Sequence, residues 1–127
     1  MSGLRIQLPA VVLVVEDESF VRMTAADMLD DAGFTVIEAG NADAAWRVLE
    51  GRDDVGVLFT DIDMPGSMDG FVLAARVAER WPQIRLVITS GRCRPRQGDV
   101  PDHGQFVPKP YLISQVLDAF EQAGSSP

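Results

Sequence analysis

The sequence has one cysteine, few basic residues and no long apolar run. Cys93 has no partner for an internal disulfide, and it is interpreted as an incidental loop thiol. Only 11 Lys and Arg residues stand against 19 Asp and Glu residues, and the formal charge of −8 opposes binding to nucleic acid or to an anionic membrane. No apolar run reaches the roughly 18 residues of a membrane span, and the first residues lack the apolar core of a signal peptide. We therefore expect a cytoplasmic protein that binds neither nucleic acid nor membrane.

The length and composition are those of one globular domain. The 127 residues fit the commonest size of a single domain, and hydrophobic residues make up 46% of the chain against 24% charged residues. We expect residues 10–123 to form the domain, with an N-terminal tail over residues 1–9 and a C-terminal tail over residues 124–127.

Short apolar runs alternate with amphipathic segments along the chain. Runs rich in β-branched residues predict strands, and apolar residues at helical spacing predict helices. The expected strands are residues 11–15, 35–39, 55–60, 85–90 and 106–108. The expected helices are residues 19–32, a segment capped by Asn41 that ends near Gly51, residues 69–81 and residues 112–123. This alternation predicts an α/β fold with a parallel sheet covered on both faces.

The segment between the last two expected strands breaks the alternation. Residues 91–105 contain Pro95, Gly98, Pro101 and Gly104, which leave no window long enough for a stable helix. We expect a loop with at most one helical turn, and therefore a degenerate or missing fourth helix.

Polar residues stand where the strands end. They are Glu16 and Asp17 after the first strand, Asp61 after the third, Thr89 in the fourth and Lys109 after the fifth. The carboxyl ends of parallel strands share one edge of the sheet, where sites of such folds lie. Three carboxylates at one edge repel one another unless some are protonated or a cation lies among them, and hard oxygen ligands select Mg2+. The pattern therefore predicts a Mg2+ site.

These residues also suit phosphoryl chemistry. An aspartate beside Mg2+ can attack a phosphoryl group, provided that charge on the transferring oxygens is neutralised. Lys109 can pair with one phosphoryl oxygen, and the hydroxyl of Thr89 can donate to another. The chain thus has a candidate for each role in forming an aspartyl phosphate on Asp61.

Four motifs together resemble the receiver domain of response regulators in two-component signalling. They are VVLVVEDES, TDIDMPGSMDG, VITSG and VPKPY, in this order and each at the end of an expected strand. The resemblance covers essentially the whole chain. It implies a flavodoxin-like (βα)5 doubly wound parallel sheet with strand order 2-1-3-4-5. It also implies a stand-alone response regulator, which catalyses only its own phosphorylation and dephosphorylation and is not otherwise an enzyme.

The resemblance implies roles for the acidic residues. Asp61 would accept a phosphoryl group from a histidine kinase or phosphotransfer protein and would also bind Mg2+. Asp17 would bind Mg2+ directly and Glu16 through water, and the main-chain carbonyl of Asp63 would be a further ligand. As a hypothesis, the side chain of Asp63 lies near the phosphoryl group and tunes its hydrolysis.

The resemblance also implies how the signal is passed on. Thr89 would move toward the phosphoryl group and Lys109 would pair with it, and the bond from Lys109 to Pro110 would be cis. Phe106 stands at the position of the switch aromatic. The output would be contact with a downstream protein target or onward phosphotransfer, and ordering of residues 91–105 is one hypothesis for the switch.

Two other functions fit parts of this pattern. Asp61 and Asp63 after an apolar strand also resemble the nucleophile motif of haloacid-dehalogenase-type phosphatases, although Met64 stands where that motif has Thr or Val. A receiver-like fold can also serve as an interaction module that is not phosphorylated. A receiver domain would be labelled stably and stoichiometrically with phosphate, and a phosphatase would turn over small phosphate esters repeatedly. An interaction module would not be labelled.

Overall fold

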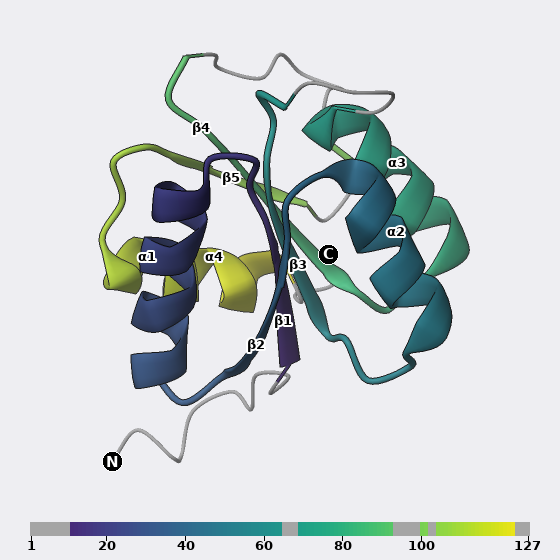
Figure 1. Ribbon diagram of the computed structural model, residues 1–127, viewed down its shortest axis with the longest axis horizontal. Helices are drawn as coiled ribbons and strands as arrows, with labels where there is room; N and C mark the ends of the chain where they lie inside the picture. Colours follow the sequence, from purple (N-terminus) through teal and green to yellow (C-terminus); the bar gives the residue numbers. More distant parts are fainter. Residues whose placement is uncertain (1–10, 65–68, 93–99, 102–103, 124–127) are drawn as a thin grey trace.

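Parallel strands form the centre of the computed structural model, which describes residues 11–64, 69–92, 100–101 and 104–123 (Figure 1). The strands are β1 (Val11–Val15), β2 (Thr35–Ala39), β3 (Val57–Asp61), β4 (Arg85–Ser90) and β5 (Gln105–Pro108). The helices are α1 (Ser19–Asp31), α2 (Ala42–Gly51), α3 (Gly70–Arg80) and α4 (Ile113–Ala123). The five strands lie in the order β2-β1-β3-β4-β5, which confirms the predicted fold.

The observed boundaries differ from the predicted ones by at most two residues. β3 begins at Val57 and includes Asp61, so that this aspartate is the last residue of the strand and not the first after it. Asp69 precedes α3 as its N-cap, where its side chain accepts a hydrogen bond of 2.9 Å from the N–H of Val72. Capping thus explains why this helix starts one residue later than predicted.

The prediction of a missing helix before β5 can be compared with the structure at only a few positions. Of residues 91–104, the structure describes 91–92, 100–101 and 104, and none of these belongs to a helix. Residues 93–99 and 102–103 lie outside the described part of the chain, as do residues 65–68 of the predicted turn after β3. The predicted ordering of residues 91–105 therefore stays a prediction.

Helices cover both faces of the sheet (Figure 1). α1 and α4 lie on one face, and α2 and α3 lie on the other. Successive strand residues point to opposite faces, so an uninterrupted apolar strand such as β1 can supply both layers of the core. Among the described residues, no helix has the length and apolar character needed to span a membrane.

Aromatic rings fill the core beneath α4. Phe120 is fully buried and meets Phe34 and Phe59 with ring centroids 5.6 Å and 5.9 Å apart. Phe59 in turn meets Tyr111 at 5.5 Å. Tyr111 follows the bond between Lys109 and Pro110, which is cis as the resemblance implied. The core therefore extends to the segment that carries Lys109.

A second aromatic contact joins α2 to the end of α3. The rings of Trp46 and Trp81 lie 5.0 Å apart between centroids. The guanidinium of Arg80 lies 4.7 Å from the Trp81 ring and forms an ion pair of 2.9 Å with Glu50. Trp81 is the C-cap of α3 and precedes β4, which places it near the amino-terminal edge of the sheet.

Candidate acidic site at the carboxyl edge of the sheet

Four polar side chains at the carboxyl ends of the strands point to the same face of the sheet. Asp61 and Thr89 are register partners in β3 and β4, while Glu16 and Lys109 directly follow β1 and β5. Residues two positions apart in a strand point to the same face. The residues two positions before these four all belong to the buried cluster beneath α1 and α4: Val14, Phe59, Val87 and Val107. The fold therefore directs all four functional groups toward one space.

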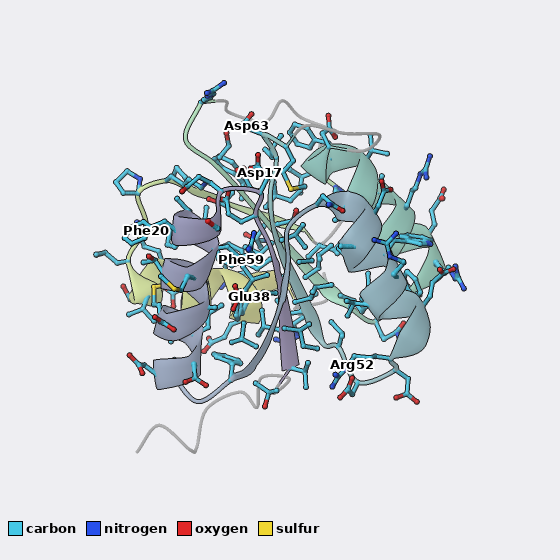
Figure 2. All side chains as sticks on the ribbon, viewed as in Figure 1. Asp17, Phe20, Glu38, Arg52, Phe59 and Asp63 are labelled. Atoms are coloured by element: carbon cyan, nitrogen blue, oxygen red, sulfur yellow. The ribbon has the colours of Figure 1, made fainter. Side chains whose placement is uncertain are left out.

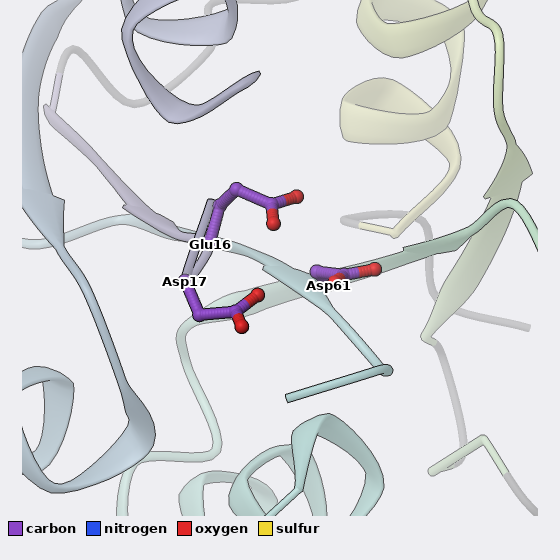
Figure 3. Close-up of side chains that lie close together, drawn as sticks. All are labelled: Glu16, Asp17 and Asp61. Carbon is purple, nitrogen blue, oxygen red and sulfur yellow. The ribbon is translucent and has the colours of Figure 1, made fainter. Parts of the chain in front are cut away.

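Glu16, Asp17 and Asp61 form the acidic part of this space (Figure 3). One carboxylate oxygen from each residue lies within 4.8 Å of the others. Glu16 and Asp61 are only 5% and 4% exposed, whereas Asp17 lies at the surface. Carboxylate oxygens gathered in this way fit a hard divalent cation such as Mg2+. The structure thus brings together the three side chains predicted to bind the metal.

Lys109 lies against these carboxylates. Its Nζ atom donates a hydrogen bond of 2.8 Å to Oε1 of Glu16 and lies 3.4 Å from Oδ1 of Asp61. Burial lowers the pKa of Lys109, but the hydrogen bond to Glu16 and the charge of Asp61 outweigh burial and leave that pKa raised. Lys109 therefore stays protonated at neutral pH and can pair with a bound anion.

The surroundings of Asp61 change the acidity of its carboxyl group. Burial and the negative charge of Glu16 raise the pKa of Asp61 to about 6, although Lys109 acts in the opposite direction. Its buried Oδ1 accepts no hydrogen bond from any described residue. A buried carboxylate oxygen that has this ion pair of 3.4 Å and no hydrogen bond is suited to bind a cation or to attack an electrophile.

Thr89 presents a second buried polar atom. Its Oγ1 has no hydrogen-bond partner within the described ranges, and the residue is 4% exposed. Leaving a buried hydroxyl without a partner costs about 1–3 kcal/mol. The hydroxyl is thus available to an acceptor that enters the site beside Asp61.

Several hydrogen bonds hold Glu16 in place, among them one of 3.1 Å from its N–H to the carbonyl of Ala39. Besides Lys109, the N–H of Glu18 donates to its Oε2 over 3.2 Å, and Nη1 of Arg22 donates to its main-chain carbonyl over 2.8 Å. Arg22 also reaches Oε1 of Glu38 in β2, at 3.2 Å. Arg22 was not predicted from the sequence, because no spacing rule connects a residue of α1 to Glu16 after β1 or to Glu38 in β2.

Asp63 lies outside the group of three carboxylates. Its Oδ2 accepts a hydrogen bond of 2.8 Å from Oγ of Ser90. Oγ of Ser90 in turn accepts a hydrogen bond of 3.1 Å from the N–H of Arg92. Sequence reasoning assigned no role to Ser90, although its position after Thr89 at the end of β4 was a usable signal.

Phe106, the predicted switch aromatic, lies on the other face of the sheet. It is half-buried, is the register partner of Ile88, and packs against a cluster of Ile62, Ala74 and Ile88. Whether it moves during signalling stays a prediction.

An open pocket of about 690 Å³ surrounds the acidic residues, and Asp63 and Arg92 also line it. Figure 2 shows Asp17 and Asp63 at one edge of the molecule, opposite Arg52 at the other. The pocket has room for a cation, its waters and a phosphoryl group.

Comparisons with known proteins identify the family. Residues 12–121 match the response regulator receiver domain, and the chain belongs to this family. The sensor kinase CckA of Brucella abortus (strain 2308) is 32% identical over 117 residues, which cover 89% of this chain and 12% of CckA. The response regulator receiver protein CpdR of the same organism is 27% identical over 114 residues, which cover 87% of this chain and 93% of CpdR.

A solved structure shows the same architecture. The response regulator receiver protein from Sinorhizobium medicae WSM419 is 26% identical, with a TM-score of 0.81 over 90% of this chain and 93% of that one.

Receiver domains are in general signalling modules of two-component systems and not enzymes. Family membership therefore favours signalling over the phosphatase alternative. The chain spans only 12% of CckA and 24% of the regulator HoxA of Cupriavidus necator, so it corresponds to a part of those proteins.

Proposed function

We propose that this chain accepts a phosphoryl group on Asp61 in a Mg2+-dependent reaction. One observation carries the proposal: the buried Oδ1 of Asp61 accepts no hydrogen bond from the described residues, yet lies 3.4 Å from the ammonium group of Lys109. A histidine kinase or phosphotransfer protein would be the donor. Similarity to a sensor kinase and to a response regulator receiver protein supports this choice of donor.

In the proposed reaction, an oxygen of ionised Asp61 forms a bond to phosphorus while the bond from phosphorus to the donor's imidazole nitrogen breaks. The electron pair of that bond stays on the nitrogen, and Asp61 becomes an acyl phosphate. Mg2+, held by Glu16, Asp17, Asp61 and the main-chain carbonyl of Asp63, would neutralise charge on the transferring oxygens. The positive charge of Lys109 adds to this neutralisation.

The new charge gives the chain a means to signal. Phosphorylation adds about 1.5 to 2 negative charges and strong hydrogen-bond acceptors. Lys109 would exchange its bond to Glu16 for one to the phosphoryl group, and the hydroxyl of Thr89 would gain an acceptor. The resulting surface would be recognised by a downstream protein or used in onward phosphotransfer. A cytoplasmic location stays a prediction.

Intact-mass analysis after incubation with acetyl phosphate and Mg2+ tests the proposal. The wild type should gain one phosphate adduct, and Asp61→Asn should gain none. The matched control Asp118→Asn, on the exposed surface of α4, should be labelled like the wild type. Chelation of Mg2+ should abolish labelling in the wild type and in Asp118→Asn.

Two other results would contradict the proposal. An unlabelled wild type that also fails to bind Mg2+ would favour an interaction module that is not phosphorylated. Repeated hydrolysis of a small phosphate ester by the wild type, lost in Asp61→Asn, would favour a phosphatase.

A further inference from the structure

Arg22 of α1 contacts the main chain between the two acidic residues that follow β1. Its Nη1 atom donates a hydrogen bond of 2.8 Å to the carbonyl of Glu16, which belongs to the peptide group that joins Glu16 to Asp17. The N–H of Glu16 in turn donates a hydrogen bond of 3.1 Å to the carbonyl of Ala39 in β2. Both main-chain polar groups of Glu16 are thus bonded, and the peptide group before Asp17 has a defined orientation.

The guanidinium of Arg22 is itself held against the end of β2. Its Nε atom donates a hydrogen bond of 3.2 Å to Oε1 of Glu38. A Cβ atom on Gly40 would lie 3.3 Å from Nη1 of Arg22, which is closer than ordinary van der Waals contact, so the glycine leaves room for the guanidinium. Because the N–H groups of a guanidinium form a rigid planar fork, the bond at Nε restricts the direction in which Nη1 points.

We propose that Arg22 is a positioning residue for the Mg2+ site, which acts through the carbonyl of Glu16 on the carboxylates of Glu16 and Asp17. The inference rests on the proposed function, because it concerns the metal that phosphorylation of Asp61 would require. Groups that hold metal ligands in place affect metal affinity even though they do not touch the metal. Arg22 would keep the main chain of the acidic pair from reorganising when Mg2+ binds.

The direction of the effect separates positioning from charge. Arg22 places a positive charge near the acidic site, and a positive charge repels Mg2+. If Arg22 acted through its charge alone, its replacement by a neutral residue would strengthen Mg2+ binding. If Arg22 positions Glu16 and Asp17, the same replacement weakens Mg2+ binding.

Titration of Mg2+ into isotope-labelled protein, followed by NMR, tests the inference. We expect Arg22→Met, which keeps an unbranched apolar side chain without donors, to bind Mg2+ about 10-fold more weakly than the wild type. Arg22→Lys keeps the charge but loses the planar fork, so its affinity should lie between the two. Glu38→Ala should weaken Mg2+ binding by about 2- to 3-fold when Arg22 is present, and by less than about 1.5-fold in the Arg22→Met background.

The same spectra report on the main chain before any metal is added. The chemical shift of the Asp17 amide nitrogen, whose peptide group contains the Glu16 carbonyl, should differ between Arg22→Met and the wild type. At saturating Mg2+ the two proteins should bind fluoroberyllate, a stable analogue of the phosphoryl group, with similar affinity, because the metal is then in place.

A destabilised control separates positioning from a general loss of stability. Leu49 is fully buried beneath α2, in the core cluster on the opposite face of the sheet. Leu49→Ala should lower the unfolding temperature and leave Mg2+ affinity unchanged. Thermal unfolding without metal shows which variants are folded, and Arg22→Lys provides the test even if Arg22→Met unfolds.

The outcomes distinguish this inference from the function on which it rests. Unchanged or tighter Mg2+ binding by Arg22→Met and Arg22→Lys would overturn the inference, as would an equal effect of Glu38→Ala in both backgrounds. Loss of fluoroberyllate binding at saturating Mg2+ would also overturn it, because the whole site would then be disrupted. A wild type that binds no Mg2+ and is not labelled on Asp61 would overturn the proposed function as well.

Discussion

Asp61 shows how burial changes the chemistry of a single carboxyl group. In water the pKa of an aspartate carboxyl group is 3.8, but at the end of β3 this group loses hydration and faces the charge of Glu16. Its pKa rises to about 6 as a result. The same residue is thus less acidic than an aspartate in water and less well solvated, which favours its reaction with a phosphoryl group once a cation is present.

The raised pKa of Asp61 predicts a pH dependence of stability in Mg2+-free protein. The pKa is 3.8 for an unperturbed aspartate and about 6 in the fold, so between these values the folded state binds more protons than the unfolded state. The free energy of unfolding should therefore fall as pH rises from about 4 to about 6, by about 3 kcal/mol in all. Asp61→Asn should lack this component. Urea unfolding of both proteins between about pH 4 and pH 7 measures it, and a constant difference between them over this range would contradict the prediction.

Thr89 leads to a prediction in which stability and binding change in opposite directions. Thr89→Val removes a buried hydroxyl that has no partner in the described part of the chain, so the free energy of unfolding should stay the same or rise by about 1–2 kcal/mol. Fluoroberyllate binding should weaken, because the anion loses a donor. Thr60 is a matched control, because its hydroxyl donates a hydrogen bond of 3.0 Å to the carbonyl of Asp61. Thr60→Val should therefore lower the free energy of unfolding by about 1 kcal/mol. Urea unfolding and calorimetry measure both effects; a large loss of stability in Thr89→Val would show that its hydroxyl is bonded.

At the scale of the elements, the start of α3 lies unusually close to the end of β3. A Cβ atom on Gly70 would collide with the main-chain oxygen of Asp61 and lie 2.8 Å from Cα of Ile62. The N–H of Gly70 also donates to the carbonyl of Ile62 over 3.2 Å. A glycine is therefore required where the helix meets the strand that carries the phosphoacceptor candidate.

Gly70→Ala should disturb the site and the fold together. The added methyl group must push α3 away from β3, and we expect a loss of about 1–3 kcal/mol in the free energy of unfolding together with weaker fluoroberyllate binding. Gly51→Ala, at the end of α2, is the matched control. A Cβ there meets nothing within 4 Å, so stability should be unchanged or slightly higher. Equal unfolding midpoints for the two variants in urea would contradict the expected collision.

The sequence was sufficient to predict elements and strand ends, and insufficient for contacts between elements. Apolar runs identified the strands because a parallel sheet buries both faces, and the polar residues that follow them identified Glu16, Asp61 and Lys109 as neighbours. The strand ends did not reveal what Arg22 and Ser90 contact. Their roles depend on hydrogen bonds to Glu16 and Asp63 whose geometry is set by packing and not by spacing.

At the scale of the whole molecule, the aromatic core beneath α4 links stability to the site. Phe120 contacts Phe34 and Phe59, and Phe59 contacts Tyr111 next to the cis bond after Lys109. Tyr111 is half-buried, and this burial raises the pKa of its hydroxyl. The position of the site lysine thus depends on the packing of the last helix.

Phe120→Ala should therefore be the most destabilising of the substitutions considered for α4. Removing a fully buried phenylalanine leaves a cavity, and we expect a loss of about 3–5 kcal/mol in the free energy of unfolding. Leu112→Ala, at a side chain that is 68% exposed, should change stability by less than about 0.5 kcal/mol. Guanidinium unfolding followed by circular dichroism compares the two. A loss below about 1 kcal/mol for Phe120→Ala would show that the helix repacks around the gap.

The contact between Trp46 and Trp81 determines what intrinsic tryptophan fluorescence can report about this protein. These are the two tryptophans of the chain, their rings meet edge to face, and neither lines the pocket around Asp61. Both fluorophores therefore sense the joint between α2 and the end of α3, together with the cation of Arg80. Intrinsic fluorescence should follow global unfolding well and should change little when an anion binds at the site. A fluorescence change on phosphorylation would mean that movement had reached the far side of the sheet.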